Sequence, residues 1–562
     1  MSDKSTNFLK LFKEKKYSLI VSIIENKIPS EKKTSALLNL SGVCRMLLRK
    51  VSSDPVESAI NDFREAYLKE TDENKLIQPI RNFINSSVIF FDVEHTTNGK
   101  LLNKNFFDEI YKIYELNKNL FEKNLELMKC ILKVFRRSLD IKSYIFYLDK
   151  FARLTSNLDL NVANIFFNNY LYNWSQTNYL ENSKKINDKL TTYPKEKLFD
   201  LTTSRKKKIN LAFISSDIRA KHSVTYFLRS ILINYDKTLF NIFIYHNNTS
   251  DDDTTKEFEK YVHKTVHIFK LKDVEVINTI RKDEIDVIVD LNGFSSDHRL
   301  NLFKNRLAPI QVSWCGYTNT TGLKEMDYLI VDKNLIMSKE ESLYSEKLIY
   351  LSDIWNCHCG YEFERSKNEL PLKKNNFITF GSFNNYNKIN DSVIEVWSSI
   401  LKKVKNSKLV LKSSISASQD IYKEKFKKNG VLDSITFESY NKEFVNHLEQ
   451  YKQIDISLDT FPWNGVTTSF ESIWMNVPVI TMEGYNFSSR CGASINKNLK
   501  LLDLIGNSKD DYVSKAVGLA ENSNKLEKIR SDLFDNVLNT PLFDKKKFSD
   551  QFFSSIKNIY NK

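Results

Sequence analysis

The stretch LDTFPWNGVTTSFESIWMNVPVI, residues 458–480, has the pattern of a buried strand, a turn and a helix. Between the two apolar parts lies a polar turn that contains Asn464, Gly465, Thr467 and Thr468. The chain has only 13 glycines in 562 residues, and one of them stands here. The turn therefore either connects two elements and caps a helix, or binds a ligand.

Short apolar runs alternate with helical stretches on both sides of this turn. They lie at residues 209–214, 239–247, 286–293, 308–316, 327–332 and 346–351, and again at 377–383, 408–413, 435–439, 455–459 and 477–482. Buried runs that alternate with helices predict parallel sheets covered on both faces. We expect an α/β fold of two Rossmann-like domains facing a cleft, with ligands at the carboxyl ends of the strands. Neither half carries the G-x-G-x-x-G turn of dinucleotide-binding proteins.

Residues 1 to about 200 are predicted to be helical, because apolar residues recur there at helical spacing. One pair of segments resembles a tetratricopeptide repeat, with Leu40 and Gly42 in the first helix and Ala59, Phe63 and Ala66 in the second. A helical domain without repeats fits the pattern equally well. We divide the chain into a helical region 1–204, a first Rossmann-like domain 205–365 and a second 366–562.

Composition and targeting signals predict a cytoplasmic protein. Lys and Arg number 83 against 70 Asp and Glu, a net charge of +13, but the basic residues are scattered, so we expect no nucleic-acid partner. The six cysteines are expected to be reduced thiols, and the pair around His358 is too closely spaced for zinc. No apolar run is long enough for a membrane span, and the N-terminus lacks a signal-peptide core.

If residues 454–459 form a strand, the turn that follows lies at its carboxyl end, where the cleft is expected. Thr467 and Thr468 then stand at the start of a helix, whose free backbone N–H groups and dipole favour an anion such as phosphate. Glu471, one turn further on, is placed to accept hydrogen bonds from a ribose. The alternative is that one threonine simply caps the helix.

A second loop at a strand end supports the ligand-binding interpretation. FGSFNNYNKIN, residues 380–390, brings Asn384, Asn385 and Lys388 to the same edge. A lysine there can neutralise a diphosphate leaving group as a point charge. His447 precedes the strand that leads into the polar turn.

From about Ile209 to Leu504 the chain resembles the catalytic region of the O-GlcNAc transferase family, including its plant SPINDLY-like branch. Six blocks occur in the family's order, among them FISSD with HSVTYFL, IDVIVDLNGF, RLAPIQVSWCGYTNTTGL, ITFGSFNNYNKI, the block 446–484 and SSRCGAS. The resemblance implies a GT-B fold preceded by a tetratricopeptide superhelix. It also implies transfer of a sugar from a nucleotide donor to a protein, with domain 205–365 on the acceptor side and domain 366–562 binding the nucleotide sugar.

The resemblance assigns roles to individual residues. Lys388 matches the lysine on the β-phosphate of the donor, Asn385 a neighbouring donor-binding position, and His447 a histidine that helps to hold the nucleotide. Thr467 and Thr468 match the pair on the diphosphate, and Glu471 takes the place of an acidic residue on the ribose. The remaining matches are Gly316 and Tyr317, on the loop that lines the sugar and acceptor, and His222, a candidate base or acceptor-site residue.

Two positions depart from the family pattern. Val466 stands where the animal O-GlcNAc enzymes carry a histidine against the nucleotide. UDP-GlcNAc is the expected donor, and this departure keeps GDP-fucose as the alternative. His222 lies five residues after Asp217, where the family has four.

We expect an inverting transfer to Ser or Thr in which Lys388, the threonines and the helix dipole stabilise the leaving diphosphate without a metal or other cofactor. An inactive helical-repeat scaffold is the alternative of another class. A homo-oligomer is possible.

Overall fold

In the computed structural model, the structure is described for residues 7–48, 56–97, 105–138, 140–201, 207–249, 252–367, 369–413, 416–439 and 444–562. The chain divides into two compact units. The first comprises residues 1–155 with 413–422, and the second 156–412 with 423–562. None of the six cysteines forms a disulfide. Among the helices that the structure describes, none has both the length and the apolar character that crossing a membrane requires.

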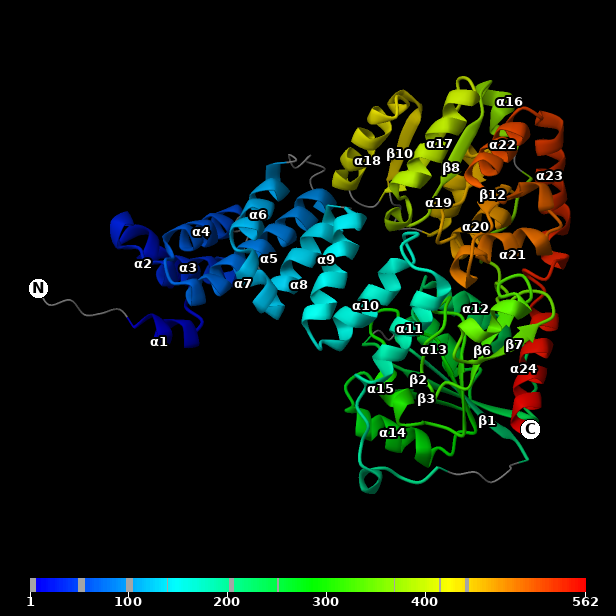
Figure 1. Cartoon of the computed structure of the whole chain (residues 1–562), viewed down its shortest axis with the longest axis horizontal. Coiled ribbons are helices and arrows are strands. Elements are labelled where there is room, and N and C mark those ends of the chain that lie inside the picture. The colour runs from blue at the N-terminus through cyan, green and yellow to red at the C-terminus, as the bar shows by residue number, and fades with distance from the viewer. Residues whose placement is uncertain are drawn as a thin grey trace, which may run out of the picture. The chain divides into compact units, whose positions relative to one another are not determined.

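The first unit is helical, as predicted (Figure 1). Its helices are α1 Phe8–Lys13, α2 Tyr17–Asn26, α3 Ser35–Leu48, α4 Val56–Lys69, α5 Glu73–Thr97, α6 Asn105–Leu116, α7 Lys118–Lys123, α8 Leu125–Arg137 and α9 Ile141–Leu154. They form because apolar side chains recur on one face of each, as in α8, where Leu127, Ile131 and Val134 are fully buried.

The small, large and small residues of α4 pack against α3, as the sequence indicates. Ala59, Phe63 and Ala66 are buried, and a side chain at Gly42 would come within 2.6 Å of the Phe63 ring. Gly42 therefore lets the two helices approach closely. The connection between α3 and α4 lies outside the described residues, and the assignment to tetratricopeptide repeats stays a prediction.

The second unit contains two parallel sheets, each with its own helices (Figure 1), which confirms the predicted fold class. The first sheet has the order β3-β2-β1-β4-β5-β6-β7 and the second β10-β9-β8-β11-β12-β13. The first is built from β1 Ile209–Ser215, β2 Phe240–His246, β3 Lys264–His267, β4 Val287–Asp290, β5 Ile310–Ser313, β6 Tyr328–Asp332 and β7 Lys347–Leu351. The second is built from β8 Thr379–Ser382, β9 Lys408–Ser413, β10 Ile435–Ser439, β11 Ile456–Leu458, β12 Val479–Met482 and β13 Ile505–Gly506.

Helices connect these strands and cover both sheets. Those before or within the first half are α10 Leu158–Asn168, α11 Gln176–Asn187, α12 Ser223–Leu232, α13 Asp253–Glu259, α14 Asp273–Lys282 and α15 Leu300–Lys304. Those of the second half are α16 Pro371–Asn375, α17 Asp391–Lys403, α18 Ser416–Lys428, α19 Phe444–Glu449, α20 Thr467–Trp474, α21 Cys491–Asn498, α22 Lys509–Ala520, α23 Ser523–Asn536 and α24 Lys545–Asn561.

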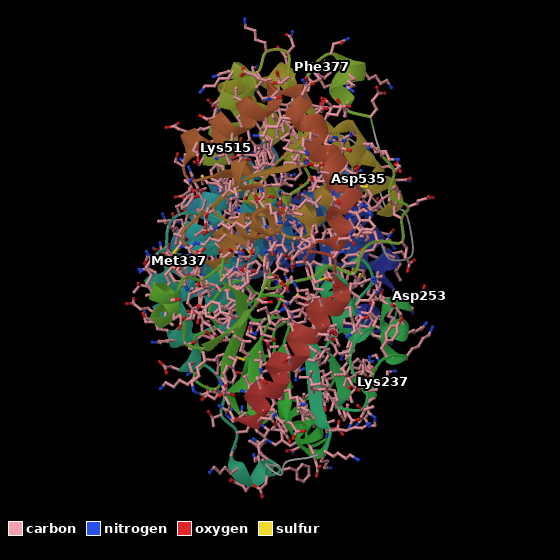
Figure 2. The ribbon with its side chains drawn as sticks, turned by 90° about the vertical axis from the view of Figure 1, so that its right-hand side faces the viewer. Lys237, Asp253, Met337, Phe377, Lys515 and Asp535 are labelled. Carbon is pink, nitrogen blue, oxygen red and sulfur yellow. The ribbon has the colours of Figure 1, made fainter. Side chains whose placement is uncertain are left out.

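Two segments pack with elements outside their predicted sequence region. Helices α10 and α11 contribute Ile165 and Tyr179 to the hydrophobic core of the first sheet, although they lie within the predicted helical region 1–204. Helix α24 lies along the first sheet (Figure 2), where the Phe552 ring is 4.8 Å from Trp314. The domain boundaries at 204 and 365 therefore stay predictions, and the first sheet's core draws on segments from both sides of them.

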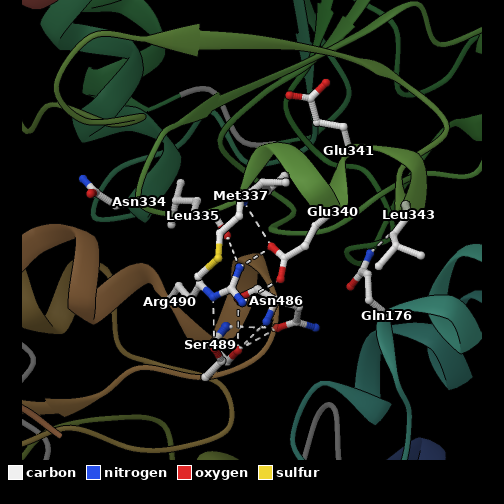
Figure 3. A network of polar contacts seen from close by, with 12 residues as sticks. Gln176, Asn334, Leu335, Met337, Glu340, Glu341, Leu343, Asn486, Ser489 and Arg490 are labelled. Atoms are coloured by element: carbon white, nitrogen blue, oxygen red, sulfur yellow. Dashed lines mark hydrogen bonds and ion pairs between the residues drawn. The ribbon is translucent and has the colours of Figure 1, made fainter. Parts of the chain in front are cut away.

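A buried arginine joins the two sheet domains (Figure 3). Arg490, next to α21, is 4% exposed, and its Nη1 and Nη2 donate to the carboxylate oxygens of Glu340 at 2.5 and 2.9 Å. The same guanidinium donates to the carbonyl oxygens of Leu335 at 3.1 Å and Gly484 at 2.9 Å. With all these donors used, the paired charges fix one side of the interface between the domains.

Candidate active site

The polar turn between β11 and α20 is organised by Asp459, the residue directly after the strand. Its Oδ1 accepts hydrogen bonds from the backbone N–H of Gly465 at 2.6 Å and of Thr460 at 2.8 Å. Its Oδ2 accepts from the Thr481 hydroxyl at 2.7 Å. Asp459 is buried, and burial raises the pKa of its carboxyl to about 6, with the backbone donors opposing the shift. These hydrogen bonds close the turn between β11 and α20 and fix the position of the start of the helix.

Glycine is required at position 465 by close packing. A side chain there would come within 2.6 Å of the Thr468 hydroxyl and 2.8 Å of the Asn384 side-chain oxygen. Gly465 therefore lets the loop after β8 approach the start of α20. This contact brings the two strand-end loops of the sequence prediction together.

The start of α20 is not capped by a threonine. The N-cap residue is Val466, and no side chain within the described residues caps the helix, whereas Thr467 and Thr468 are its first two residues. The Thr468 hydroxyl instead donates to Asn384 Oδ1 at 2.8 Å. The capping alternative is therefore wrong, and the helix start borders a small pocket whose lining includes Ser382, Asn384, Thr468 and Ser469.

Lys388 reaches the same turn from the loop after β8, where Tyr386–Lys388 form a 3₁₀ turn. Its Nζ donates to the carbonyl oxygen of Asn464 at 2.7 Å. Burial lowers the pKa of this lysine to about 8, and Asp459 partly offsets the shift. The ammonium group therefore lies beside the residues that precede α20, as predicted from the sequence.

Asn385 takes a different position from its neighbours. It is exposed, and its side-chain oxygen caps the 3₁₀ turn by accepting the backbone N–H of Asn387 at 3.0 Å. It lies in the same loop as Lys388, but its described hydrogen bond is local.

Glu471 and His447 contact one another next to Tyr451, a residue that lines the pocket. Glu471 is 6% exposed, and its Oε2 lies 3.0 Å from His447 Nε2 and accepts the Tyr451 hydroxyl at 3.0 Å. Lys412, at the end of β9, contacts His447 Nδ1. Burial lowers the pKa of Lys412 to about 8, and Glu471 opposes the shift. Because an ammonium group can only donate, His447 Nδ1 accepts from Lys412. His447 Nε2 then carries the ring proton and donates it to Glu471.

His222 and Asp217 form a pair at the start of α12. His222 Nε2 lies 3.4 Å from Asp217 Oδ1, and Nδ1 accepts the backbone N–H of Val224 at 3.4 Å. Lys221, directly before His222, has a positive φ of 63°. Burial lowers the pKa of His222, and the Asp217 carboxylate opposes this. In the tautomer that fits both contacts, Nδ1 accepts the Val224 N–H and caps the helix, while Nε2 carries the ring proton towards Asp217. A general-base role for His222 therefore stays a prediction.

Gly316 and Tyr317 lie in the loop after β5. A side chain at Gly316 would overlap the Leu291 carbonyl oxygen at 1.7 Å, so only glycine fits. The Tyr317 ring is 2% exposed and packs 5.2 Å from Phe294. The aromatic ring of Tyr317 therefore belongs to the core, and an acceptor-side role for this loop stays a prediction.

Two residues of the site were not selected from the sequence: Asp459 and Lys412. Asp459 had a usable signal, because a carboxylate directly after a buried strand and six residues before a glycine can close a turn on backbone N–H groups. Lys412 lies one residue before the end of β9, and its sequence context does not distinguish it from the many other lysines of the chain. Its contact with His447 depends on the tertiary fold.

Comparisons with known proteins show which family the chain belongs to. A model of glycosyl transferase family 41 matches residues 180–358 and 363–552, and the chain belongs to this family. It is similar to the SPINDLY protein of Arabidopsis thaliana, 32% identical over 381 residues, which are 66% of this chain and 41% of that protein. That relative is named as a probable UDP-N-acetylglucosamine–peptide N-acetylglucosaminyltransferase.

The SEC protein of Arabidopsis thaliana, with the same printed activity, is 26% identical over 370 residues, 63% of this chain and 37% of that protein. The chain thus spans about two fifths of the length of the curated relatives it matches. Among solved structures, an O-GlcNAc transferase variant from Thermobaculum terrenum superposes with a TM-score of 0.75 at 21% identity. That superposition covers 94% of this chain and 98% of the other, and it shows the fold.

Proposed function

We propose that this chain transfers a sugar from a nucleotide diphosphate donor to a Ser or Thr hydroxyl of a protein, with inversion at the anomeric carbon. The observation that carries the proposal is that the uncapped start of α20 and the Asn384–Thr468 contact border one pocket, while Lys388 Nζ bonds to the turn that leads into the same helix. A diphosphate is the ligand class that a lysine ammonium and free helical N–H groups recognise together.

The reaction follows from these groups. The acceptor hydroxyl oxygen bonds to the anomeric carbon while the bond from that carbon to the diphosphate oxygen breaks, and the electron pair stays on the diphosphate. Lys388 and the first N–H groups of α20 stabilise the charge that develops there. The hydroxyl proton leaves to a base or to water, with His222 as the candidate. We propose that no divalent metal or other cofactor takes part.

We propose UDP-GlcNAc as the donor, on the printed names of the relatives. GDP-fucose is the second candidate because Val466 occupies the N-cap of α20, where the animal enzymes place a histidine. Glu471, held by His447 and Tyr451, is proposed to accept a ribose hydroxyl at its second oxygen. A cytoplasmic location, self-association and the absence of membrane and nucleic-acid partners stay predictions.

One experiment separates these candidates. The protein is incubated with a peptide library and with UDP-GlcNAc or GDP-fucose, and modified peptides are identified by mass spectrometry. Modification with UDP-GlcNAc that is lost in Lys388→Ala supports the first donor, and modification with GDP-fucose alone rejects it. If neither nucleotide binds and no peptide is modified, the chain is the inactive scaffold of the sequence alternatives.

A further inference from the structure

The indole of Trp463, in the polar turn before α20, faces the candidate donor lysine. Lys388 Nζ lies 5.0 Å from the centroid of the Trp463 ring while it donates to the carbonyl oxygen of the next residue, Asn464. An ammonium over an indole face is attracted by the negative face of the π system. The lysine is therefore held by two neighbouring residues of the same turn.

The Trp463 ring is fixed in turn by residues from α10 and the segment after it. The Tyr170 ring lies 4.8 Å from it, and the Phe166 ring 5.0 Å with an interplanar angle of 73°. The Asn390 side-chain amide donates to the carbonyl oxygens of Tyr170 at 3.2 Å and Phe461 at 2.8 Å. Ring contacts and backbone bonds thus limit how far the indole can turn.

The series of rings continues towards the first sheet. Phe166 also lies 6.4 Å from Tyr317, with the two rings inclined by 27°. Tyr317, Phe166 and Trp463 therefore form a continuous aromatic contact from the loop after β5 to the ammonium group of Lys388. A helix that precedes both sheets in the sequence supports the site through these contacts.

We propose that Trp463 is a positioning residue that holds the Lys388 ammonium at the start of α20 before the donor binds, with Phe166 and Tyr170 as its supports. This inference rests on the proposed role of Lys388 in donor binding. A charge fixed in place before binding stabilises the leaving diphosphate without reorganisation, whereas a mobile lysine must first be ordered. The competing explanation is that Trp463 contributes only packing.

The test measures binding of UDP and GDP by calorimetry, together with kcat and KM for the donor that is turned over. We expect Trp463→Leu to weaken binding of the preferred nucleotide about five- to thirtyfold, the range for a cation–π contact that is partly removed from water. Trp463→Phe, which keeps a ring, should stay within about threefold of the unmodified protein. The matched control is Trp174→Leu, because Trp174 is also half-buried but packs on Tyr179.

A double substitution separates positioning from packing. In a Lys388→Met background, Trp463→Leu should cause no further loss of nucleotide affinity. Nucleotide affinity unchanged in Trp463→Leu, or an equal loss in the Lys388→Met background, would overturn the inference. If Lys388→Met itself binds nucleotide normally, the proposed function of the lysine fails instead. Should Trp463→Leu not fold, Phe166→Leu removes one support and should give a smaller loss in the same assays.

Discussion

The protonation of Lys388 provides a quantitative test of the proposed diphosphate site. Its pKa lies at about 8 because burial disfavours the charged form. Only the ammonium form neutralises a diphosphate, so donor affinity should be full below this pKa and fall as the pH rises through it. In the unmodified protein we therefore expect nucleotide-sugar binding to weaken between neutral and mildly alkaline pH.

The size of the effect follows from the pKa. About nine tenths of the lysine is charged one pH unit below this value and about one tenth one unit above it. The apparent dissociation constant should therefore rise about tenfold between pH ~7 and pH ~9, which corresponds to about 1.4 kcal/mol. Removal of the side chain in Lys388→Ala should weaken binding by about 1.5–3 kcal/mol, the range for a hydrogen bond to a charged group.

The assay is titration calorimetry with UDP-GlcNAc, which carries no phosphate that titrates in this range. The control is Lys388→Arg, whose guanidinium stays charged, so its affinity should be lower in absolute terms but nearly independent of pH. Lys412→Met serves as a second control, because the pKa of Lys412 also lies at about 8. A flat profile for the unmodified protein, or an equal decline in Lys388→Arg, would refute the reasoning.

Three further outcomes are expected from other parts of the structure. Arg490→Gln leaves the half-buried Glu340 carboxylate without its partner and should lower the free energy of unfolding of the second unit by about 1.5–3 kcal/mol in urea titrations, the range for hydrogen bonds to a charged group. A change below about 0.5 kcal/mol would show that the pair does not fix the domain interface. Gly42→Leu must displace the Phe63 ring and should destabilise the helical unit by about 1–3 kcal/mol, seen as a lower thermal midpoint. The matched comparison is Gly518→Leu, because Gly518 is also in a helix but a side chain there meets no atom within 4 Å. His222→Asn retains a capping acceptor, so it should lower kcat by about a hundredfold at unchanged thermal stability if His222 is the general base; turnover close to that of the unmodified protein would reject that role.

The buried strands could be predicted because apolar runs carry their own signal. Each run selected from the sequence coincides with a strand, from β1 to β12. Two strands had no such signal. The edge strand β3, KTVH, is largely accessible to solvent and mixes polar with apolar residues, and β13 has only two residues. Strands that are short or at an edge are specified by their neighbours rather than by hydrophobic pattern.

The candidate site divides in the same way. Lys388 and the start of α20 could be placed because both follow strands at the same edge of a parallel sheet. The contacts of Asp459 with Gly465 and Thr481 could not be placed, since they join residues that only the folded turn brings together. Trp463 gave no functional signal at all, because an aromatic residue in a turn is usually a packing residue, and its partners Phe166 and Tyr170 lie some 300 residues earlier.

The position of α24 has a consequence for biosynthesis. This helix packs its aromatic residues on the first sheet, with the Phe552 ring 6.2 Å from Phe213 and 4.8 Å from Trp314. About two hundred residues, including the whole second sheet, leave the ribosome between β7 and α24. At synthesis rates of about 5–20 residues per second, the apolar surface of the first sheet that α24 covers stays exposed for some 10–40 seconds. A nascent chain stalled before α24 should therefore bind chaperones that recognise exposed aromatic surface, and release them once the helix emerges.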